Sequence, residues 1–254
     1  MRCSRCRGEA VVTQRYSGLA FCRRHLREDV EAKARREIRA EGGIRPGDHM
    51  AIVFSGGPES IVLARFLLRT FGKRRDMSFF AVGPDGGDRL CSSQDALEAV
   101  ARSLGLEWIP SPPGGSGAAP PGGTTRDPRA HLREATALRA GATVLVRGDC
   151  LDDLAGHVLG RVMKGEVPEG RRQPALRTLT PFRRIPRDEI RLYAGEIGVR
   201  WDDAPPGGLR DDWEDLAAAL LADHASRHPS APHALVRLWD SLEGREEGIL
   251  RRET

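Results

Sequence analysis

The sequence predicts an α/β protein built on a parallel sheet, with a small metal-binding module at its N-terminus. Short continuous apolar runs alternate with amphipathic helical segments, and the first run ends in glycines directly before a helix. Two pairs of metal-ligating residues lie close to the N-terminus, and they predict the module. At 254 residues the chain is long enough for one such domain and a small addition.

Composition limits the class of protein. The hydrophobic fraction of 39% is compatible with a packed core, and no apolar run approaches the ~20 residues that a membrane-spanning helix needs. The N-terminus carries no apolar signal segment, so we expect a cytoplasmic protein without membrane association. The net charge is +4 and most basic residues are arginine, which weakly favours a nucleic-acid partner. A solvated arginine-rich surface is the alternative.

Residues 1–27 are predicted to form a zinc-finger module. The ligand pairs are Cys3-x-x-Cys6 and Cys22-x-x-His25, and the residues between the pairs can form a short hairpin. A segment this short cannot bury enough apolar surface to fold alone, so the metal would supply much of its folding free energy. Four protein ligands leave no position for water, which predicts a structural zinc. Unrelated free thiols are the alternative.

A charged helix is predicted to connect this module to the main domain, over residues 28–47. Apolar residues recur at helical spacing from residue 26 to residue 41, and glycines and a proline then end the helix. The main domain covers residues 48–200, and residues 201–254 are predicted to form a C-terminal helical segment.

The first apolar run of the main domain, residues 50–54, is typical of a strand buried on both faces, and a helix is predicted over residues 61–68. Glycines join the two, so that backbone N–H groups and the positive end of the helix dipole face one point, which suits a phosphate. An ordinary strand–turn–helix junction is the alternative. The candidate nucleotide-binding residues here are Phe54, Ser55, Gly56, Gly57, Glu59 and Ser60.

Four further apolar runs continue the strand–helix pattern. Such alternation implies right-handed crossovers and a parallel sheet whose ligand lies at the carboxyl ends of the strands, near a switch in strand order. Gly83 follows the second strand and is therefore a further nucleotide-binding candidate. Residues 111–125 are rich in glycine and proline and are expected to form a mobile loop over the site. The four runs cover residues 77–82, 106–109, 142–146 and 175–180.

A group of acidic residues follows the strand at residues 142–146. Asp152 and Asp153 begin the next helix, where carboxylates could hold Mg²⁺ on bound phosphates; helix capping is the alternative. We take Asp152 as a candidate catalytic residue, and Gly148 and Asp153 as candidate nucleotide ligands. Cys150 is a second catalytic candidate, as a thiolate; a small buried residue is the alternative.

Four motifs in this order resemble the PP-loop ATP pyrophosphatase superfamily, and within it the tRNA 2-thiouridine sulfurtransferases that thiolate ribothymidine in the T-loop. The paired ligands resemble that group's N-terminal zinc finger, and residues 55–60 resemble its SGGxDS loop. Residues 148–153 resemble its GHNxDD motif. Residues 177–193 resemble its Lys/Arg-x-x-x-Pro-Phe segment and the helix after it.

The resemblance implies a Rossmann-like fold of the adenine nucleotide α-hydrolase type, with ATP, Mg²⁺ and Zn²⁺ as cofactors and tRNA as partner. It implies that a uridine O2 attacks ATP to give adenylylated tRNA and pyrophosphate, and that sulfur then displaces AMP. The sulfur would come from a ubiquitin-like carrier. A homodimer, or a heterodimer with an active paralogue, is also possible on this basis.

The sequence departs from the family at the positions of its iron–sulfur cluster. Family members have two cluster cysteines just before the helix predicted near Pro128, where residues 124–130 here contain none. A third family cysteine precedes a proline, and here Ala204 precedes Pro205. No cysteine follows Cys150, so the family's second, C-terminal zinc finger is missing as well.

Other departures affect the loop and the thiols. Glu59 stands where the family has Asp, and Asp149 stands where it has His. Only Cys91 and Cys150 lie outside the finger, too few to hold a cluster, so we expect no iron–sulfur cluster. Two functions stay open: a divergent, cluster-free ATP-dependent tRNA thiolase or other adenylylating enzyme, and a non-catalytic paralogue that binds ATP, tRNA or an active partner.

Overall fold

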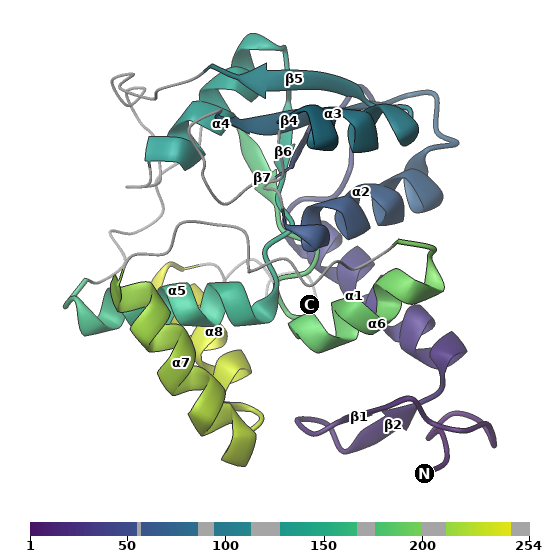
Figure 1. Ribbon diagram of the computed structural model, residues 1–254, viewed down its shortest axis with the longest axis vertical. Helices are drawn as coiled ribbons and strands as arrows, with labels where there is room; N and C mark the ends of the chain where they lie inside the picture. The colour runs from purple at the N-terminus through teal and green to yellow at the C-terminus, as the bar shows by residue number, and fades with distance from the viewer. Residues whose placement is uncertain (55–56, 86–93, 113–127, 167–175, 200–211, 245–254) are drawn as a thin grey trace, which may run out of the picture.

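A computed structural model describes residues 1–54, 57–85, 94–112, 128–166, 176–199 and 212–244 of the chain. Figure 1 shows a central sheet with helices against it, and a second group of helices below. The N-terminal hairpin lies at the lower end of the same view. None of the helices in these ranges is long and apolar enough to cross a membrane.

The central sheet has five parallel strands in the order β5-β4-β3-β6-β7. Strands β4 and β5 follow β3 on one side, and the chain then crosses to the other side for β6 and β7. The predicted parallel sheet is confirmed, and its strand order switches between β3 and β6. The strands are β3 (His49–Val53), β4 (Ser78–Asp85), β5 (Glu107–Ser111), β6 (Val144–Val146) and β7 (Arg177–Leu179).

Helices cover both faces of this sheet, which is why its strands read as continuous apolar runs. Met50 and Ile52 of β3 join a large core on one face, and Ala51 and Val53 join a smaller core on the other. The smaller core includes Ala137 of α4 (Pro128–Arg139). The larger core includes residues of α1 (Arg23–Ala40), α2 (Pro58–Phe71), α3 (Gln94–Ser103) and α6 (Arg187–Glu196).

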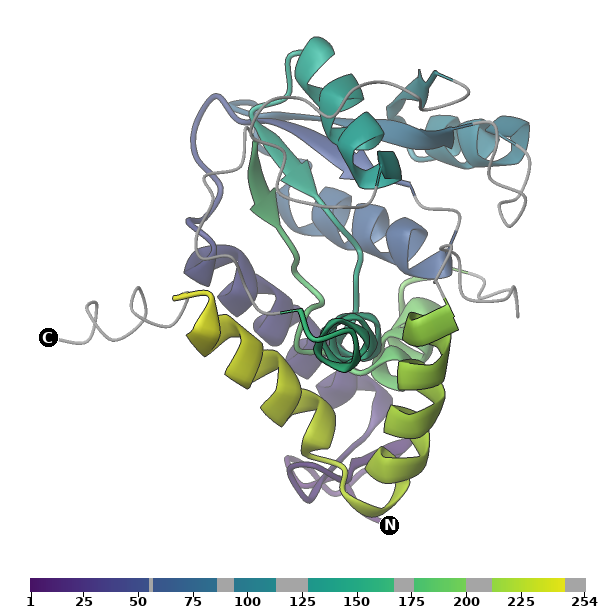
Figure 2. The same cartoon turned by 90° about the vertical axis from the view of Figure 1, so that its left-hand side faces the viewer.

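The lower helical group consists of α5 (Leu151–Met163), α7 (Asp212–Arg227) and α8 (Ala231–Leu242). In Figure 2, α5 is seen end-on between α7 and α8. Glycines let α5 and α7 approach closely, because a Cβ added to Gly160 would lie 3.3 Å from the Cα of Glu214. Oε1 of the same glutamate lies 2.7 Å from Nδ1 of His157 on α5, within hydrogen-bond distance.

The N-terminal module contains the predicted hairpin, formed by β1 (Val12–Gln14) and β2 (Leu19–Phe21). Gly18 turns the chain between them with φ +72°, a conformation that favours glycine. Hydrogen bonds join the module to α6: Gln14 Nε2 donates to Glu189 Oε2 at 2.9 Å, and Tyr16 Oη donates to Oε1 at 2.6 Å. The module is therefore continuous with the main core, which its Phe21 also enters.

Some boundaries differ from those predicted. Helix α2 begins at Pro58 instead of residue 61, because the fixed φ of proline suits the first helical turn. Strand β4 continues two residues past Gly83 to Asp85, and β5 includes Ser111, the first residue of the predicted mobile loop. The rest of that loop, from residue 113, lies outside the described residues.

Candidate metal and nucleotide sites

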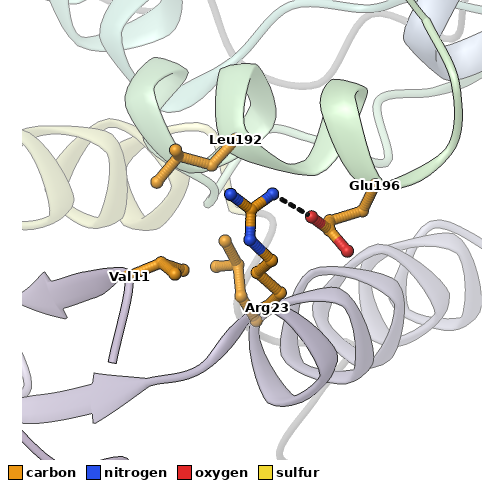
Figure 3. Close-up of a pocket in the computed structure, with 5 residues that line it drawn as sticks. Val11, Arg23, Leu192 and Glu196 are labelled. Atoms are coloured by element: carbon orange, nitrogen blue, oxygen red, sulfur yellow. Dashed lines mark hydrogen bonds and ion pairs between the residues drawn. The ribbon is translucent and has the colours of Figure 1, made fainter. Parts of the chain in front are cut away.

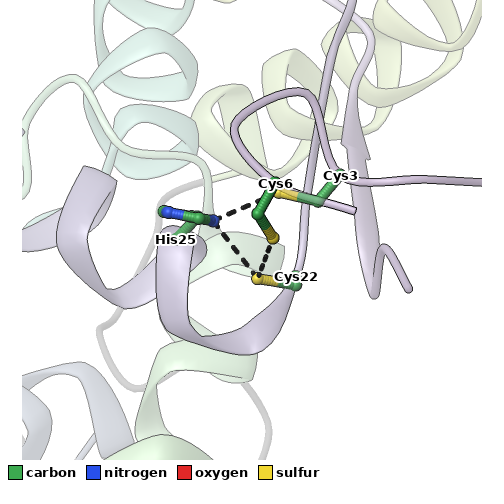
Figure 4. Close-up of side chains that lie close together, drawn as sticks. All are labelled: Cys3, Cys6, Cys22 and His25. Carbon is green, nitrogen blue, oxygen red and sulfur yellow. Dashed lines mark hydrogen bonds between the residues drawn. The ribbon is translucent and has the colours of Figure 1, made fainter. Parts of the chain in front are cut away.

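The four predicted zinc ligands converge in the N-terminal module, as Figure 4 shows. His25 Nδ1 lies 3.3 Å from Cys3 Sγ and 3.4 Å from Cys22 Sγ. The sulfurs of Cys6 and Cys22 are 3.8 Å apart. Zinc bound tetrahedrally spaces two sulfurs by about 3.8 Å, and a sulfur and an imidazole nitrogen by about 3.6 Å. The four side chains therefore fit a tetrahedral metal ion and could hold one.

Neighbouring groups favour metal binding by two of these ligands, Cys3 and His25. Burial pushes the pKa of Cys3 upwards, but hydrogen bonds from the backbone of Cys22, Arg5 and Cys6 and from His25 outweigh it and lower that pKa to about 6. His25 turns Nδ1 to the sulfurs and Nε2 towards Glu28, 3.8 Å from its Oε2. A carboxylate on the outer imidazole nitrogen orients a metal-ligating histidine.

A small pocket lies between the module and α6 (Figure 3). Its volume is about 40 Å³, room for a water molecule but not for a nucleotide. An ion pair joins Arg23 Nη1 to Glu196 Oε1 across 2.9 Å within it. We read it as a packing gap. Its lining residues are Val11, Arg23, Leu26, Leu192 and Glu196.

The predicted phosphate loop is described only in part, since Ser55 and Gly56 lie outside the described residues. Gly57 is the N-cap of α2, and no side chain described here caps that helix end. Ser60 Oγ donates to Gly57 O at 2.7 Å and closes the first turn. Phe54 is fully buried and packs edge-on against Trp108, so its place is in the core.

Two candidate glycines have different surroundings. A Cβ on Gly148 would lie 3.2 Å from the backbone N of Ser60, so the segment after β6 passes directly against the first turn of α2. A Cβ on Gly83 would lie 2.3 Å from Trp108 Cζ2 and would clash with it, so close packing against Trp108 explains the glycine at this position. The structure therefore brings Gly148 against the first turn of α2, at the switch between β3 and β6.

Candidate acidic residues meet beside this loop, where Glu59, Cys150 and Asp153 each offer a ligand atom within 4.8 Å of the others. Arg187, the first residue of α6, also reaches this point, with Nε 2.9 Å from Glu59 Oε1 and Nη2 donating to Asp153 Oδ1. Its backbone N–H donates to Asp152 Oδ2 at 2.7 Å. Burial raises the pKa of Glu59, although the charge of Arg187 opposes that shift.

Arg187 was missed by the sequence reasoning. A cation in the first turn of a helix opposes the helix dipole, and such a residue needs acidic partners to be stable there. The arginine directly after Pro186 was therefore a signal that carboxylates from elsewhere in the chain meet the start of α6.

Cys150 caps α5 as a buried, neutral thiol. Its Sγ donates to Asp153 Oδ2 at 2.9 Å, and its backbone N–H donates to the same oxygen at 3.1 Å. Burial and the nearby charges of Asp153 and Asp152 raise the pKa of the thiol well above its usual value. This environment favours the alternative of a small buried residue over a catalytic thiolate, and Asp153 acts as the capping partner.

Two implied groups fit these residues poorly. Magnesium takes oxygen ligands, but Glu59, Asp152 and Asp153 already bind Arg187, whose positive charge lies among them. An iron–sulfur cluster needs several thiolates, whereas Cys150 is buried and bonded to Asp153. Cys91, the other thiol outside the finger, lies outside the described residues, as do Ala204 and Pro205.

Comparison with known proteins points to one family. The family of the N-terminal LIM domain of 2-thiouridine synthetase TtuA matches residues 2–27. The tRNA 2-thiolation protein NcsA of Haloferax volcanii is 25% identical, over 95% of this chain and 87% of that protein. The tRNA-5-methyluridine(54) 2-sulfurtransferase of Thermus thermophilus is also 25% identical, over 79% of this chain and 68% of that protein. Over most of its length the chain is therefore similar to PP-loop tRNA thiolases, at 25% identity.

A solved structure has a similar fold. The U34-tRNA thiolase NcsA from Methanococcus maripaludis, with its 4Fe–4S cluster, superposes with a TM-score of 0.78 at 20% identity. The match covers 96% of this chain and 87% of that one. The chain therefore has the predicted α/β fold, with its cysteine and histidine ligands in an N-terminal module.

Proposed function

We propose that this chain is an ATP-dependent tRNA uridine 2-thiolation enzyme that works without an iron–sulfur cluster. The observation that carries the proposal is the packing of Gly148 against the first turn of α2 at the switch between β3 and β6. That packing joins the two motifs expected to bind a nucleotide. Relatives named for tRNA 2-thiolation, similar over most of this chain, supply the substrate class.

ATP would bind at the N-terminus of α2, where Gly57 leaves the backbone N–H groups without a side-chain cap among the described residues. The phosphates would meet these N–H groups and the positive end of the helix dipole. Arg187, whose side chain is 27% exposed, adds a positive charge beside them. These groups can stabilise the negative charge that develops when the α-phosphorus is attacked.

The proposed reaction has two steps. The uridine O2 attacks the α-phosphorus of ATP, an O–P bond forms, and pyrophosphate leaves. The sulfur of a carrier thiocarboxylate then attacks C2, and AMP leaves with the oxygen. Water cleaves the remaining C–S bond to the carrier, which leaves as its carboxylate. In this chain Asp152 acts as a positioning residue, because its carboxylate accepts the backbone N–H of Arg187 and fixes the start of α6.

The N-terminal site would hold zinc for a structural purpose. Three sulfurs and one nitrogen suit zinc, and four protein ligands complete its tetrahedron. The finger rests on α6 through Gln14 and Tyr16, so the metal would stabilise the helix that carries Arg187. We also propose tRNA, a ubiquitin-like sulfur carrier and a second subunit as partners, on the basis of the family alone.

ATP–pyrophosphate exchange in the presence of bulk tRNA tests the proposal. Wild-type protein should exchange label only when tRNA is present, and Gly57→Asp should not, because its carboxylate would repel the phosphates. Gly195→Asp is the matched control, since Gly195 is exposed on α6 with nothing within 4 Å of an added Cβ. A strain lacking the gene should lose a 2-thiolated nucleoside from its tRNA.

The second function, a non-catalytic paralogue, is favoured by the buried, neutral thiol of Cys150 and by the missing cluster cysteines. It predicts that calorimetry detects ATP binding by wild-type protein but that no exchange occurs with any tRNA. Equal ATP affinity in wild-type protein and Gly57→Asp would show that the loop is not the ATP site. It would contradict the proposed enzyme and leave only a paralogue that binds tRNA or an active partner.

A further inference from the structure

Arg187 occupies the centre of the carboxylate cluster at the switch between β3 and β6. Its guanidinium binds Glu59 and Asp153, and its backbone N–H binds Asp152. These three carboxylates come from the starts of α2 and α5, whereas the arginine comes from the start of α6. All three carboxylates therefore already have a partner on Arg187.

The backbone holds Arg187 in this position. Pro186 precedes it with φ −59°, which fixes the entry of the chain into α6. Leu151 N–H donates to Ile185 O at 3.0 Å, and Arg187 N–H donates to Asp152 at 2.7 Å. Two hydrogen bonds thus tie the start of α6 to the start of α5. These backbone contacts hold the guanidinium next to the carboxylates of Glu59 and Asp153.

Charge and burial favour the arginine over a metal ion. The Glu59 side chain is 11% exposed and that of Arg187 is 27% exposed, so little solvent screens their attraction. The nearby Asp149 has its own partner, with Arg147 Nε 2.8 Å from Oδ2. A divalent ion among these oxygens would have to displace the guanidinium and leave two cations close together in a partly buried place.

We propose that Arg187 is the built-in counter-ion of this cluster and excludes a divalent metal ion from it. A nucleotide bound at the loop then meets an arginine instead of a metal ion held by the protein. This last consequence rests on the proposed function, whereas the exclusion of metal does not.

Manganese binding without nucleotide tests the exclusion, because Mn²⁺ accepts the same oxygen ligands as Mg²⁺ and its paramagnetic signal changes on binding. The test uses the full chain with its finger loaded with zinc. Wild-type protein should show no Mn²⁺ site with a Kd below about 1 mM. Arg187→Met should gain one site that binds at least about tenfold tighter. Arg187→Met/Glu59→Gln should lose that gain, and Arg187→Lys should behave like wild type.

Two results would overturn the proposal: a tight Mn²⁺ site in wild-type protein that Glu59→Gln removes, or a folded Arg187→Met protein that gains no site. If Arg187→Met does not fold, the wild-type and Glu59→Gln titrations decide between exclusion and binding. ATP titrations in EDTA and in Mg²⁺ test the consequence, and wild-type affinities should agree within about threefold. A lack of ATP binding in both buffers contradicts the proposed function, and the Mn²⁺ result still judges Arg187.

Discussion

The chain holds two clusters of side chains of the types that bind metals, and they differ in what the ligand atoms contact. In the finger, Cys3 and Cys22 each contact His25, and Cys6 contacts Cys22, at the distances of a metal tetrahedron. In the second cluster, Glu59 and Asp153 both contact an arginine. In both clusters the ligand atoms lie within 4.8 Å of one another. Close spacing of potential ligand atoms therefore does not by itself identify a metal site. A metal site also requires that no cationic side chain already neutralises those ligands.

The largest effect in this comparison should come from Cys22→Ser. Loss of one of four ligands opens the tetrahedron, so zinc affinity should fall by at least about 100-fold and the module should lose its folded structure. Metal analysis and limited proteolysis of the first residues measure both. The control is Cys150→Ser, which removes a buried thiol from the other cluster and should keep full zinc content. Full zinc stoichiometry in Cys22→Ser would show that Cys22 is not a zinc ligand and would contradict the assigned zinc site.

The second cluster should show its charge balance when Arg187 is replaced by Met. Glu59 and Asp153 then lose their shared cation in a partly buried place, which should cost roughly 2–3 kcal/mol of the free energy of unfolding at pH 8. Urea unfolding of wild-type protein, Arg187→Met and Arg187→Lys measures the loss, and Arg187→Lys should recover part of it.

The same variant should show a pH dependence of known sign. Burial raises the pKa of Glu59 above its usual 4.5, and the charge of Arg187 opposes that shift, so the pKa rises further in Arg187→Met. A carboxyl group with a raised folded-state pKa contributes stability at low pH, and that stability is lost as the pH rises from 4.5 through the folded value. The deficit of Arg187→Met should therefore grow with pH across this window. A deficit that shrinks as the pH rises would contradict the assigned role of the arginine.

Packing between the two nucleotide motifs should give a smaller effect. Gly148→Ala places a Cβ 3.2 Å from the backbone N of Ser60, so the segment after β6 must shift by a few tenths of an ångström. ATP affinity should fall by about tenfold because the shift disturbs the first turn of α2. Gly195→Ala is the control, since its Cβ meets nothing within 4 Å and alanine favours the helix. Equal loss of ATP affinity in both variants would show that the packing of Gly148 against α2 does not contribute specifically to ATP binding.

The sequence predicted those features that depend on neighbouring residues in the chain. Apolar runs gave the strands, and the spacing of Cys3, Cys6, Cys22 and His25 gave the finger. The contacts of Arg187 were not predicted, because its partners lie at the starts of two other helices, which only the folded sheet brings together. Gly83 was assigned to nucleotide binding because it follows an apolar run, but its close neighbour is Trp108 of the adjacent strand. The sequence does not show which residues face each other across strands.

The smallest expected effect concerns the link between the two clusters. Tyr16 of the finger donates to Glu189 at 2.6 Å, and Glu189 lies two positions after Arg187 on α6. Tyr16→Phe keeps the ring but removes this donor, while Gln14 and Lys33 still bind the carboxylate. The loss should therefore be about 1 kcal/mol of unfolding free energy, with zinc content unchanged.

Lys33→Met is the matched variant for this link, because it removes a charge from the same carboxylate instead of a hydroxyl. It should cost more stability than Tyr16→Phe, since a buried glutamate with a weakened counter-charge is costlier than one with a missing neutral donor. ATP affinity in Tyr16→Phe shows whether the finger positions Arg187 through α6. An unchanged affinity with reduced stability means that the two clusters are joined only through the stability of the fold, whereas a loss of affinity beyond about threefold means that the finger also orients the nucleotide site.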